Sequence, residues 1–419
     1  MNEATRHFIR THRTEDVRAL ALQASRSAEV DITFALNQIQ GWQTAKVKLP
    51  SWAALEEIIY PPHLNMEQCS SEATARYKAA LVMPHTATET AQPLTLVDLT
   101  GGFGVDFSWM ARCCDRAWYV ERNADLCQVA KQNFHTLGLR QAEVIHADAL
   151  SCLDQAETDA PFPPHVSVIY MDPARRNSNG GKVVDIADCQ PDVLALLPKL
   201  LRQCDKLILK LSPMLDWHKA VAQLQRVKEV HIVSVGNECK ELLLVLTPEP
   251  SSAPIVVCAN LDASHVPSAD EEDLFSKQSL TFSPEEMALP VTPQAAALTA
   301  GMYLYEPNAS IMKAGCFAAI AQRYYVEALS PNTHLYVSGL MREAFPGRRF
   351  VIEAVSTFNK KALKQQLQSV SKANIATRNF PLTVAELRKR LRLKEGGEYY
   401  LFATTFKERE HVVIITKKV

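Results

Sequence analysis

A glycine-rich turn directly after a short apolar run constrains this chain more than any other feature. The run Leu96–Leu99 has Asp98 as its one charged residue and leads into residues 100–104, Thr-Gly-Gly-Phe-Gly. The apolar run predicts a buried strand, and the residues from Val105 onward predict a helix. Glycines between a strand and a helix carry no Cβ, so a ligand can approach the backbone closely. The spacing Asp-x-x-x-Gly-x-Gly differs from the Gly-x-Gly-x-x-Gly of dinucleotide sites.

The composition is that of an ordinary globular protein. The chain has 419 residues, 47% of them hydrophobic and 22% charged, and such a length predicts about two to four domains. No apolar run reaches the roughly 18 residues of a membrane span, and the polar N-terminus lacks the apolar core of a signal peptide. The ten cysteines show no Cys-x-x-Cys spacing, which favours free thiols in a reducing cytoplasm over disulfides or a zinc site. We therefore expect a cytoplasmic protein without a metal.

Charge is distributed unevenly along the chain. Residues 341–419 hold 17 lysines and arginines and 7 acids, a net charge of +10, whereas the preceding 340 residues have a net charge of −11. Within the basic part, cations surround the apolar positions of a predicted helix over Val384–Leu391: Arg388, Lys389, Arg390, Arg392 and Lys394. A basic module on an acidic chain indicates a polyanionic partner, although a solvated helix face is the alternative.

The first 250 residues predict a helical region and then an α/β domain. For residues 1–85 we expect helices in Val17–Ser27, in Ala53–Ile59 before the Pro61-Pro62 break, and in Glu72–Val82 after a Ser70-Ser71 cap. Residues 86–250 alternate strands and helices and end in a hairpin, which predicts a doubly wound, Rossmann-like sheet of seven strands. The predicted strands are 96–99, 117–120, 143–146, 166–171, 206–211, 229–235 and 241–246, and the helices are 105–112, 124–137, 192–203 and 217–227.

Two small α+β domains are expected after a proline-rich linker at 248–254. The first, 251–335, has a predicted strand at 255–258 and a helix near 309–325. The second, 336–419, has a strand at 335–337, helices at 361–370 and 384–391, and closing strands at 399–405 and 411–416. Thr383 and Glu386 have the spacing of a capping box, and Leu382 and Leu387 that of a hydrophobic staple.

The glycine turn resembles the first motif of class I methyltransferases, which bind S-adenosylmethionine. Glu121, seventeen residues after Gly104, and Asp148 end the next two predicted strands. Glu121 is placed to accept from ribose hydroxyls and Asp148 from an adenine amino group, although each could be a loop charge. Asp98 could bind the methionine ammonium or cap local amides. We predict an S-adenosylmethionine site of Asp98, Thr100, Gly102, Phe103, Gly104, Glu121 and Asp148.

The fourth predicted strand ends in Asp172-Pro173-Ala174-Arg175. This resembles the Asp/Asn-Pro-Pro-aromatic motif of methyltransferases that modify exocyclic amines, in which the carboxylate and the next carbonyl orient the amine. Ala174 replaces the second proline, and Arg175 replaces the aromatic residue that stacks on a flipped base, which weakens the case for a base nitrogen. Arg175 could instead stack on a base or hold a phosphate, and Asp172 could simply cap the turn. We predict Asp172, Pro173 and Arg175 as catalytic, and the following loop, 176–188, could close over substrate.

Over nearly its full length the chain resembles a bacterial family of RNA methyltransferases with a THUMP-like C-terminal domain. The resemblance is carried by residues 66–78, 96–106, 171–176, 303–308 and 372–381. It implies a helical region (1–85), a class I methyltransferase domain (86–250), a ferredoxin-like domain (251–335) and a THUMP-like domain (336–419). THUMP domains engage structured RNA, so tRNA or rRNA is the expected partner, bound through Arg378, Arg388, Lys389, Arg390, Arg392 and Lys394. Two other functions stay open: a methyltransferase of small molecules or proteins, and an RNA-binding protein with weak or no catalysis.

Overall fold

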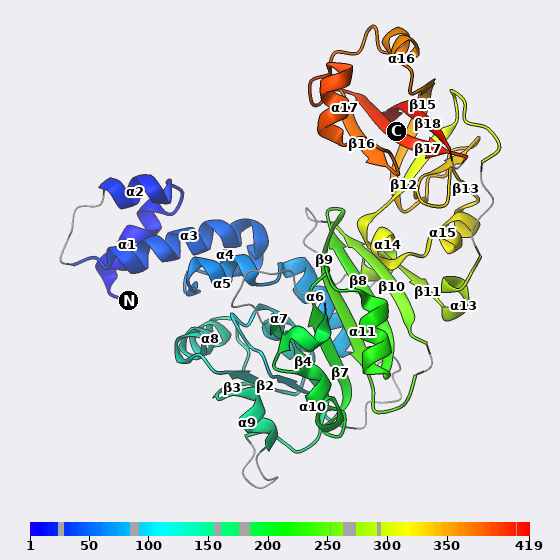
Figure 1. Cartoon of the computed structure of the whole chain (residues 1–419). Coiled ribbons are helices and arrows are strands. Elements are labelled where there is room, and N and C mark those ends of the chain that lie inside the picture. The colour runs from blue at the N-terminus through cyan, green and yellow to red at the C-terminus, as the bar shows by residue number, and fades with distance from the viewer. Residues whose placement is uncertain are drawn as a thin grey trace. The chain divides into compact units, whose positions relative to one another are not determined.

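Figure 1 shows the computed structural model of the chain. The structure describes residues 1–23, 29–83, 92–154, 161–175, 185–251, 253–262, 274–290, 295–407 and 409–419. The chain divides into two compact units. The first consists of residues 1–236, 240–254 and 261–278, and the second of residues 237–239, 255–260 and 279–419.

The N-terminal region of the first unit is helical, as predicted. Its helices are α1 (Glu3–His12), α2 (Val17–Gln23), α3 (Ile32–Lys48), α4 (Pro50–Ala53), α5 (His63–Gln68) and α6 (Glu72–Val82). The Ser71 side chain caps α6 by accepting from the Thr74 amide, because a helix start leaves amides without intrahelical partners. The helix α3 lies in a segment for which no helix was predicted.

The prediction of a helix over Ala53–Ile59 is wrong. After α4 the backbone is not helical, and Ile58 and Tyr60 are buried. The Asn133 side chain accepts from the Ile59 amide and donates to the Ile59 carbonyl. These bonds replace the backbone partners that a helix would have provided, and they fix the backbone at Ile59, just before the two prolines.

The sheet of the first unit is doubly wound and Rossmann-like, as predicted. Its strands are β1 (Thr95–Asp98), β2 (Arg116–Glu121), β3 (Ala142–His146), β4 (Val166–Met171), β7 (Cys204–Leu211), β8 (Val227–Val235) and β9 (Glu238–Leu246). Parallel pairing joins β1 to β2 and β4, β2 to β3, and β4 to β7. The hairpin strand β9 lies antiparallel beside β7. The seven strands of the first unit lie in the order β8-β9-β7-β4-β1-β2-β3.

Helices in this unit follow the predicted alternation, with short additions. They are α7 (Val105–Met110), the 3-10 turn η2 (Ala111–Cys113), α8 (Ala124–Thr136), α9 (Ala149–Asp154), η3 (Ile186–Asp188), α10 (Val193–Leu200), α11 (Trp217–Leu224) and α12 (Leu274–Lys277). The short helices α9 and α12 were not predicted. One buried cluster joins α6, α7 and α8 to alternate residues of the strands, among them Leu96, Tyr119, Val168 and Tyr170. This packing fixes the ends of β1 and β4 next to each other.

The second unit contains a seven-stranded sheet in the order β13-β14-β12-β15-β18-β17-β16. Its strands are β12 (Tyr303–Pro307), β13 (Glu327–Ala328), β14 (Tyr336–Ser338), β15 (Gly347–Thr357), β16 (Asn374–Arg378), β17 (Tyr399–Phe406) and β18 (Glu410–Lys418). The sequence predicted parts of β14, β17 and β18 only. The unit also contains β10 (Ile255–Leu261) and its antiparallel partner β11 (Ser279–Phe282).

The helices of the second unit are α13 (Pro284–Met287), α14 (Ala309–Ala314), α15 (Phe317–Tyr324), α16 (Lys360–Gln366) and α17 (Val384–Leu391). The long helix predicted near 309–325 is instead two helices, because Gly315 ends α14 in the left-handed conformation with φ +80°. Thr383 and Glu386 form the predicted capping box of α17. Leu363 of α16 and Leu387 of α17 pack with Leu401 and Val413 in one buried cluster, so both helices cover the same face of the sheet.

The close packing of Tyr119 against the glycine turn generates a prediction. A Cβ added at Gly101 would lie 2.2 Å from Tyr119 Cε2, and forcing an atom into a packed core costs about 1–3 kcal/mol. We expect Gly101→Ala to lower the free energy of unfolding of the first unit by that amount in urea titrations. The control is Gly339→Ala, where an added Cβ meets no atom within 4 Å. An unchanged urea midpoint in Gly101→Ala would contradict this packing argument.

Candidate active site

A cavity of about 720 Å³ lies at the carboxyl edge of the first unit's sheet, where ligands bind in open α/β sheets. The ends of β1, β4 and β7 and the glycine turn line it. Seven of the predicted site residues are among its lining residues: Asp98, Thr100, Gly102, Phe103, Gly104, Asp172 and Pro173. Of the other three predicted residues, Glu121 and Asp148 are not among them, and the side chain of Arg175 lies outside the described residues.

Two side chains of β2 hold the glycine turn through hydrogen bonds. Gly102 and Gly104 have φ of +56° and +82°, a left-handed conformation that favours glycine. Tyr119 donates its hydroxyl to the Gly102 carbonyl at 2.5 Å, and Glu121 Oε2 accepts from the Gly102 amide at 2.9 Å. Glu121 is therefore joined directly to the turn, and its two carboxylate oxygens can still accept further hydrogen bonds.

Asp98 and Asp172 are connected through Thr100. Asp98 Oδ1 accepts from the Thr100 amide at 2.8 Å and from its hydroxyl at 3.3 Å. Thr100 Oγ1 in turn accepts from the Asp172 amide at 2.6 Å. Burial raises the pKa of Asp98 well above its usual range, so the carboxyl group resists ionisation. Asp98 therefore caps the Thr100 amide, which is one of its two predicted alternatives, and it also lines the cavity.

Asp148 follows β3, and its neighbour Ala147 donates its amide to the Glu121 carbonyl. The Asp148 side chain is exposed, and Oδ1 accepts from the Leu150 amide at 2.9 Å at the start of α9. The unpredicted helix α9 thus gives this acid a local partner, and its role toward a cofactor stays a prediction.

The segment after Asp172 forms a small ribbon. The strand β5 (Ala174–Arg175) pairs antiparallel with β6 (Cys189–Gln190). The side chain of Arg175 and most of the predicted loop, residues 176–184, lie outside the described residues. The catalytic role of Arg175 therefore stays a prediction.

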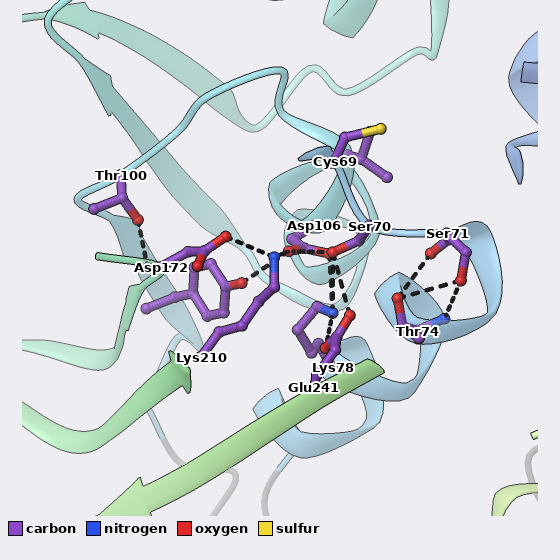
Figure 2. A network of polar contacts seen from close by, with 12 residues as sticks. Cys69, Ser70, Ser71, Thr74, Lys78, Thr100, Asp106, Asp172, Lys210 and Glu241 are labelled. Atoms are coloured by element: carbon purple, nitrogen blue, oxygen red, sulfur yellow. Dashed lines mark hydrogen bonds and ion pairs between the residues drawn. The ribbon is translucent and has the colours of Figure 1, made fainter. Parts of the chain in front are cut away.

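A chain of alternating charges continues from Asp172 into the protein (Figure 2). Lys210 Nζ lies 2.6 Å from Asp172 Oδ2 and 3.5 Å from Asp106 Oδ2. Lys78 Nζ lies 3.2 Å from Asp106 Oδ1 and 2.5 Å from Glu241 Oε2. We call these five residues, Asp172, Lys210, Asp106, Lys78 and Glu241, the charged chain. Lys210, Asp106, Lys78 and Glu241 lie in β7, α7, α6 and β9, and Asp172 directly follows β4. The charged chain therefore connects five elements.

Two hydroxyl groups complete the surroundings of Asp106. Ser70 and Tyr170 each donate to Asp106 Oδ2 at 2.8 Å. Burial alone would raise the pKa of Asp106, but Lys78, Lys210 and these hydroxyls lower it to about 2. Burial likewise lowers the pKa of Lys210, but Asp172 and Asp106 outweigh it and hold that pKa well above its usual range. Both side chains therefore stay charged at neutral pH.

Four members of the charged chain were not predicted from the sequence: Lys78, Asp106, Lys210 and Glu241. The available signal was weak but present. Lys210 stands within the apolar run Leu207–Leu211, and Lys78 follows Tyr77 and precedes two alanines in α6. A lysine in such surroundings is seldom fully buried without a partner, so each of these lysines implied an acid nearby.

A second cavity, of about 640 Å³, adjoins the first. The two share five lining residues: Gln68, Cys69, Ser70, Lys210 and Lys240. Elsewhere the second cavity is lined mainly by residues of α3 and α6, together with Pro50, Glu67, Ser71, Val235 and Glu241. Lys210 therefore lies where the two cavities meet.

The predicted RNA-binding cations differ in their surroundings. Arg378 pairs with the buried Glu306 at 2.6 Å, Arg388 donates to the Ala373 carbonyl, and Arg390 lies 4.5 Å from the Phe358 ring centroid. The remaining three cations, Lys389, Arg392 and Lys394, are exposed. These three side chains are thus the best placed to contact a phosphate.

All ten cysteines are free thiols. Within the described residues no cluster of three or more His, Cys, Asp or Glu side chains could hold a metal ion. Nor does this part of the chain contain a helix with both the length and the apolar character needed to cross a membrane.

The central place of Asp106 leads to a prediction. Removing one partner of a buried ion pair leaves an uncompensated charge and costs about 3–5 kcal/mol. We expect Asp106→Asn to lower the free energy of unfolding by this amount at pH 7 in urea titrations. The control Glu56→Gln breaks the exposed pair with Arg10 and should cost about 1 kcal/mol or less. Equal effects of the two substitutions would contradict a supporting role for the charged chain.

The wild type and Asp106→Asn should also show a specific pH dependence. A carboxyl group whose folded-state pKa is depressed stabilises the fold above its unfolded pKa of about 3.9 and loses this contribution as pH falls. With the pKa of Asp106 at about 2, the stability difference between wild type and Asp106→Asn should be full at pH 5–7. It should shrink as pH falls from about 4 toward 2. A difference that stays constant over that range would contradict the depressed pKa.

Comparison with known proteins agrees with this architecture. A ferredoxin-like domain model matches residues 303–346, and a THUMP domain-like model matches residues 347–418. No curated protein matches the chain. Two partial structural matches are a SAM-dependent methyltransferase from Agrobacterium tumefaciens and an rRNA methylase from Streptococcus thermophilus. The Agrobacterium protein is 17% identical over 42% of this chain and 61% of that chain, with a TM-score of 0.30. The Streptococcus protein is 15% identical over 42% of this chain and 93% of that chain, with a TM-score of 0.28. TM-scores this low carry no weight for this chain.

One solved structure matches along nearly the whole chain. It is a protein of Porphyromonas gingivalis W83 assigned as a methyltransferase, with 30% identity and a TM-score of 0.82 over 99% of this chain and 98% of that chain. Together with the two domain models, this match confirms the family resemblance inferred from the sequence. The chain therefore belongs to the methyltransferase family of the Porphyromonas gingivalis protein, in which a methyltransferase sheet is followed by ferredoxin-like and THUMP-like domains.

Proposed function

We propose that this protein is an S-adenosylmethionine-dependent methyltransferase that modifies structured RNA, either tRNA or rRNA. The observation that carries the proposal is the cavity at the carboxyl edge of the sheet. There the glycine turn, the buried Asp98 and the partly exposed side chain of Asp172 line the same cavity. The family assignment supports methyl transfer, and the basic THUMP-like part supports RNA as the substrate.

The turn residues fit a nucleoside cofactor. A Cβ at Gly102 would meet only the Thr100 carbonyl, at 3.7 Å, whereas the space beside Gly101 and Gly104 is filled by Tyr119 and Phe134. Gly102 is thus the position where a ligand can lie against the backbone. We infer that Glu121 accepts from the ribose hydroxyls and that Asp98 faces the amino-acid part of the cofactor. When bound, S-adenosylmethionine would supply a methyl group already activated by its sulfonium charge.

Asp172 is the residue best placed to act on the methyl acceptor. Its side chain is 41% exposed, it lines the cavity, and its backbone amide is fixed by Thr100. A methyl group that is already activated needs an aligned acceptor more than it needs acid–base chemistry. We infer that Asp172, with Pro173 setting the direction of the turn, aligns the acceptor group.

The C-terminal cations support RNA as the partner. Lys389, Arg392 and Lys394 are exposed on and directly after α17, and residues 341–419 have a net charge of +10. Contacts from such cations to phosphates give affinity without sequence specificity. The nucleotide would then be chosen by the cavity and not by the basic surface.

Cofactor binding is tested by Glu121→Ala. The loss of a charged hydrogen-bond acceptor should weaken S-adenosylmethionine binding by about 1–3 kcal/mol, measured by titration calorimetry on the full chain. The control is Asp125→Ala, which removes an exposed acid near the start of α8 and should leave the affinity unchanged. If Glu121→Ala binds as tightly as wild type, Glu121 does not belong to the cofactor site.

RNA binding is tested by Lys389→Gln, Arg392→Gln and Lys394→Gln combined. The triple variant should bind bulk tRNA and rRNA more weakly in gel shifts. Its log–log dependence on salt should be flatter by roughly 0.7–0.9 for each phosphate that the variant no longer neutralises. The charge-matched control combines Lys131→Gln, Arg140→Gln and Arg202→Gln, three exposed cations of the first unit. Equal weakening by both triple variants would contradict a specific role for the THUMP-like part and would favour a small-molecule or protein substrate.

A further inference from the structure

We propose that the methyl acceptor is a hydroxyl group, and in RNA the 2′-hydroxyl of a ribose, and not the exocyclic amine of a base. The inference deepens the proposed function and rests on it for the RNA and for the sulfonium methyl donor. The observation behind it is the contact between Lys210 and Asp172 at the acceptor end of the cavity.

Lys210 is fixed beside Asp172 by its surroundings. Its Nζ lies 2.6 Å from Asp172 Oδ2, and its side chain is 13% exposed. Asp106 contacts the same ammonium from behind, and Asp106 is itself held by Lys78, Ser70 and Tyr170. The ammonium is therefore a permanent part of the site, and it lines both cavities.

A cation at this position opposes transfer to an amine. An amine nitrogen gains positive charge as it accepts a methyl group, and an ammonium nearby raises the energy of that transition state through like-charge repulsion. Lys210 also donates to Asp172 Oδ2, so an amine that used this carboxylate would lie next to the ammonium. The position of the ammonium thus disfavours an amine.

The same arrangement suits a hydroxyl acceptor. The hydroxyl oxygen must lose its proton, so negative charge develops on it, and a fixed ammonium stabilises that charge. In the step we infer, Lys210 donates to the hydroxyl oxygen while Asp172 takes the proton and releases it to solvent. A lone pair of the oxygen forms the new C–O bond as the carbon–sulfur bond of the donor breaks, and the electron pair of that bond stays on sulfur as a neutral thioether.

The second cavity gives the acceptor a place to bind. It meets the first at Lys210. Its lining includes the cations Lys48, Arg76 and Lys240 and the acids Glu67, Glu72 and Glu241, of which Glu72 pairs with Arg76 and Glu241 with Lys78. A ribose in a nucleic-acid chain carries phosphates on both sides, so an anionic backbone beside the reacting hydroxyl is to be expected. Lys210 and Lys240 line both cavities, so they can face such a backbone where the cavities meet, and the first cavity is left to the methyl donor.

The product identifies the acceptor directly. Bulk tRNA and rRNA from a strain lacking the gene are incubated with the full chain and S-adenosylmethionine labelled in the methyl group, and then hydrolysed in alkali. A 2′-O-methyl group blocks cleavage of the adjacent phosphodiester, so the label should appear in alkali-resistant dinucleotides. Label in mononucleotides would overturn this inference and leave the proposed function intact. No transfer to any RNA, with cofactor binding intact, would overturn both.

Variants of Lys210 separate chemistry from folding. Lys210→Met should lower the transfer rate by about 100-fold or more, the scale seen when one donor to a developing oxyanion is removed, and Lys210→Arg should retain more activity. The control is Lys228→Met, which removes a lysine of β8 that lines neither cavity. Calorimetric affinity for S-adenosylhomocysteine should stay within threefold of wild type in all three variants. An equal loss of activity in Lys210→Met and Lys228→Met would contradict the inference.

The pH–rate profile distinguishes this role from a structural one. If Lys210 stabilises the deprotonated oxygen, the defect of Lys210→Met should become smaller as pH rises, because hydroxide then helps to remove the proton. A structural defect would lower the rate by the same factor at every pH. A constant ratio between wild type and Lys210→Met from pH 7 to 10 would therefore overturn the proposed role.

Discussion

The carboxylate of Asp106 is the group on which the geometry of the site depends. It lies in the first turn of α7, directly after the glycine turn, and it binds Lys78 of α6, Tyr170 of β4 and Lys210 of β7. A shift of α7 would move the glycine turn and Lys210 together. The cofactor turn and the acceptor end of the cavity are thus positioned by one buried anion.

Burying the charged chain costs free energy, and this bears on its role in the protein. Each buried charge loses several kcal/mol of hydration, and apolar residues of similar volume often stabilise a fold as well or better. The charged chain is therefore a poor device for stability alone. Its ordered alternation of signs does something that an apolar core cannot do, since it keeps an ammonium group at a defined position beside Asp172. This favours a functional explanation for the buried lysines.

The sequence predicted features that depend on local chemistry. The strand and glycine turn at 95–104, the acid after β4 and the capping box of α17 all follow from short-range patterns. Asp98 and Asp172 were expected at one sheet edge because parallel strands end there, and Thr100 connects them. Asp148 was expected there for the same reason; it follows β3, and its carboxylate accepts from the Leu150 amide at the start of α9.

Features that depend on distant partners could not be predicted in this way. Lys78 of α6 and Glu241 of β9 are 163 positions apart, and only the folded chain brings them together. The segment 53–59 has an amphipathic pattern, yet Asn133, more than seventy positions away, captures the Ile59 backbone. Strands β12, β15 and β16 lie in a sheet whose partners come from several parts of the chain. In each case the pattern was ambiguous until a residue remote in sequence decided it.

The unusual turn after β4 and the buried Lys210 have a common explanation. A site that methylates a base amine needs an aromatic surface for the flipped base and a carboxylate free to receive amine hydrogens. This chain has Arg175 where the aromatic residue would stand and Ala174 in place of the second proline, and Lys210 occupies one oxygen of Asp172. The altered turn and the Lys210 contact both disfavour methylation of a base amine. Neither hinders a ribose hydroxyl, which lies on the nucleic-acid backbone and requires no base to stack in the site, so they are consistent with one acceptor chemistry.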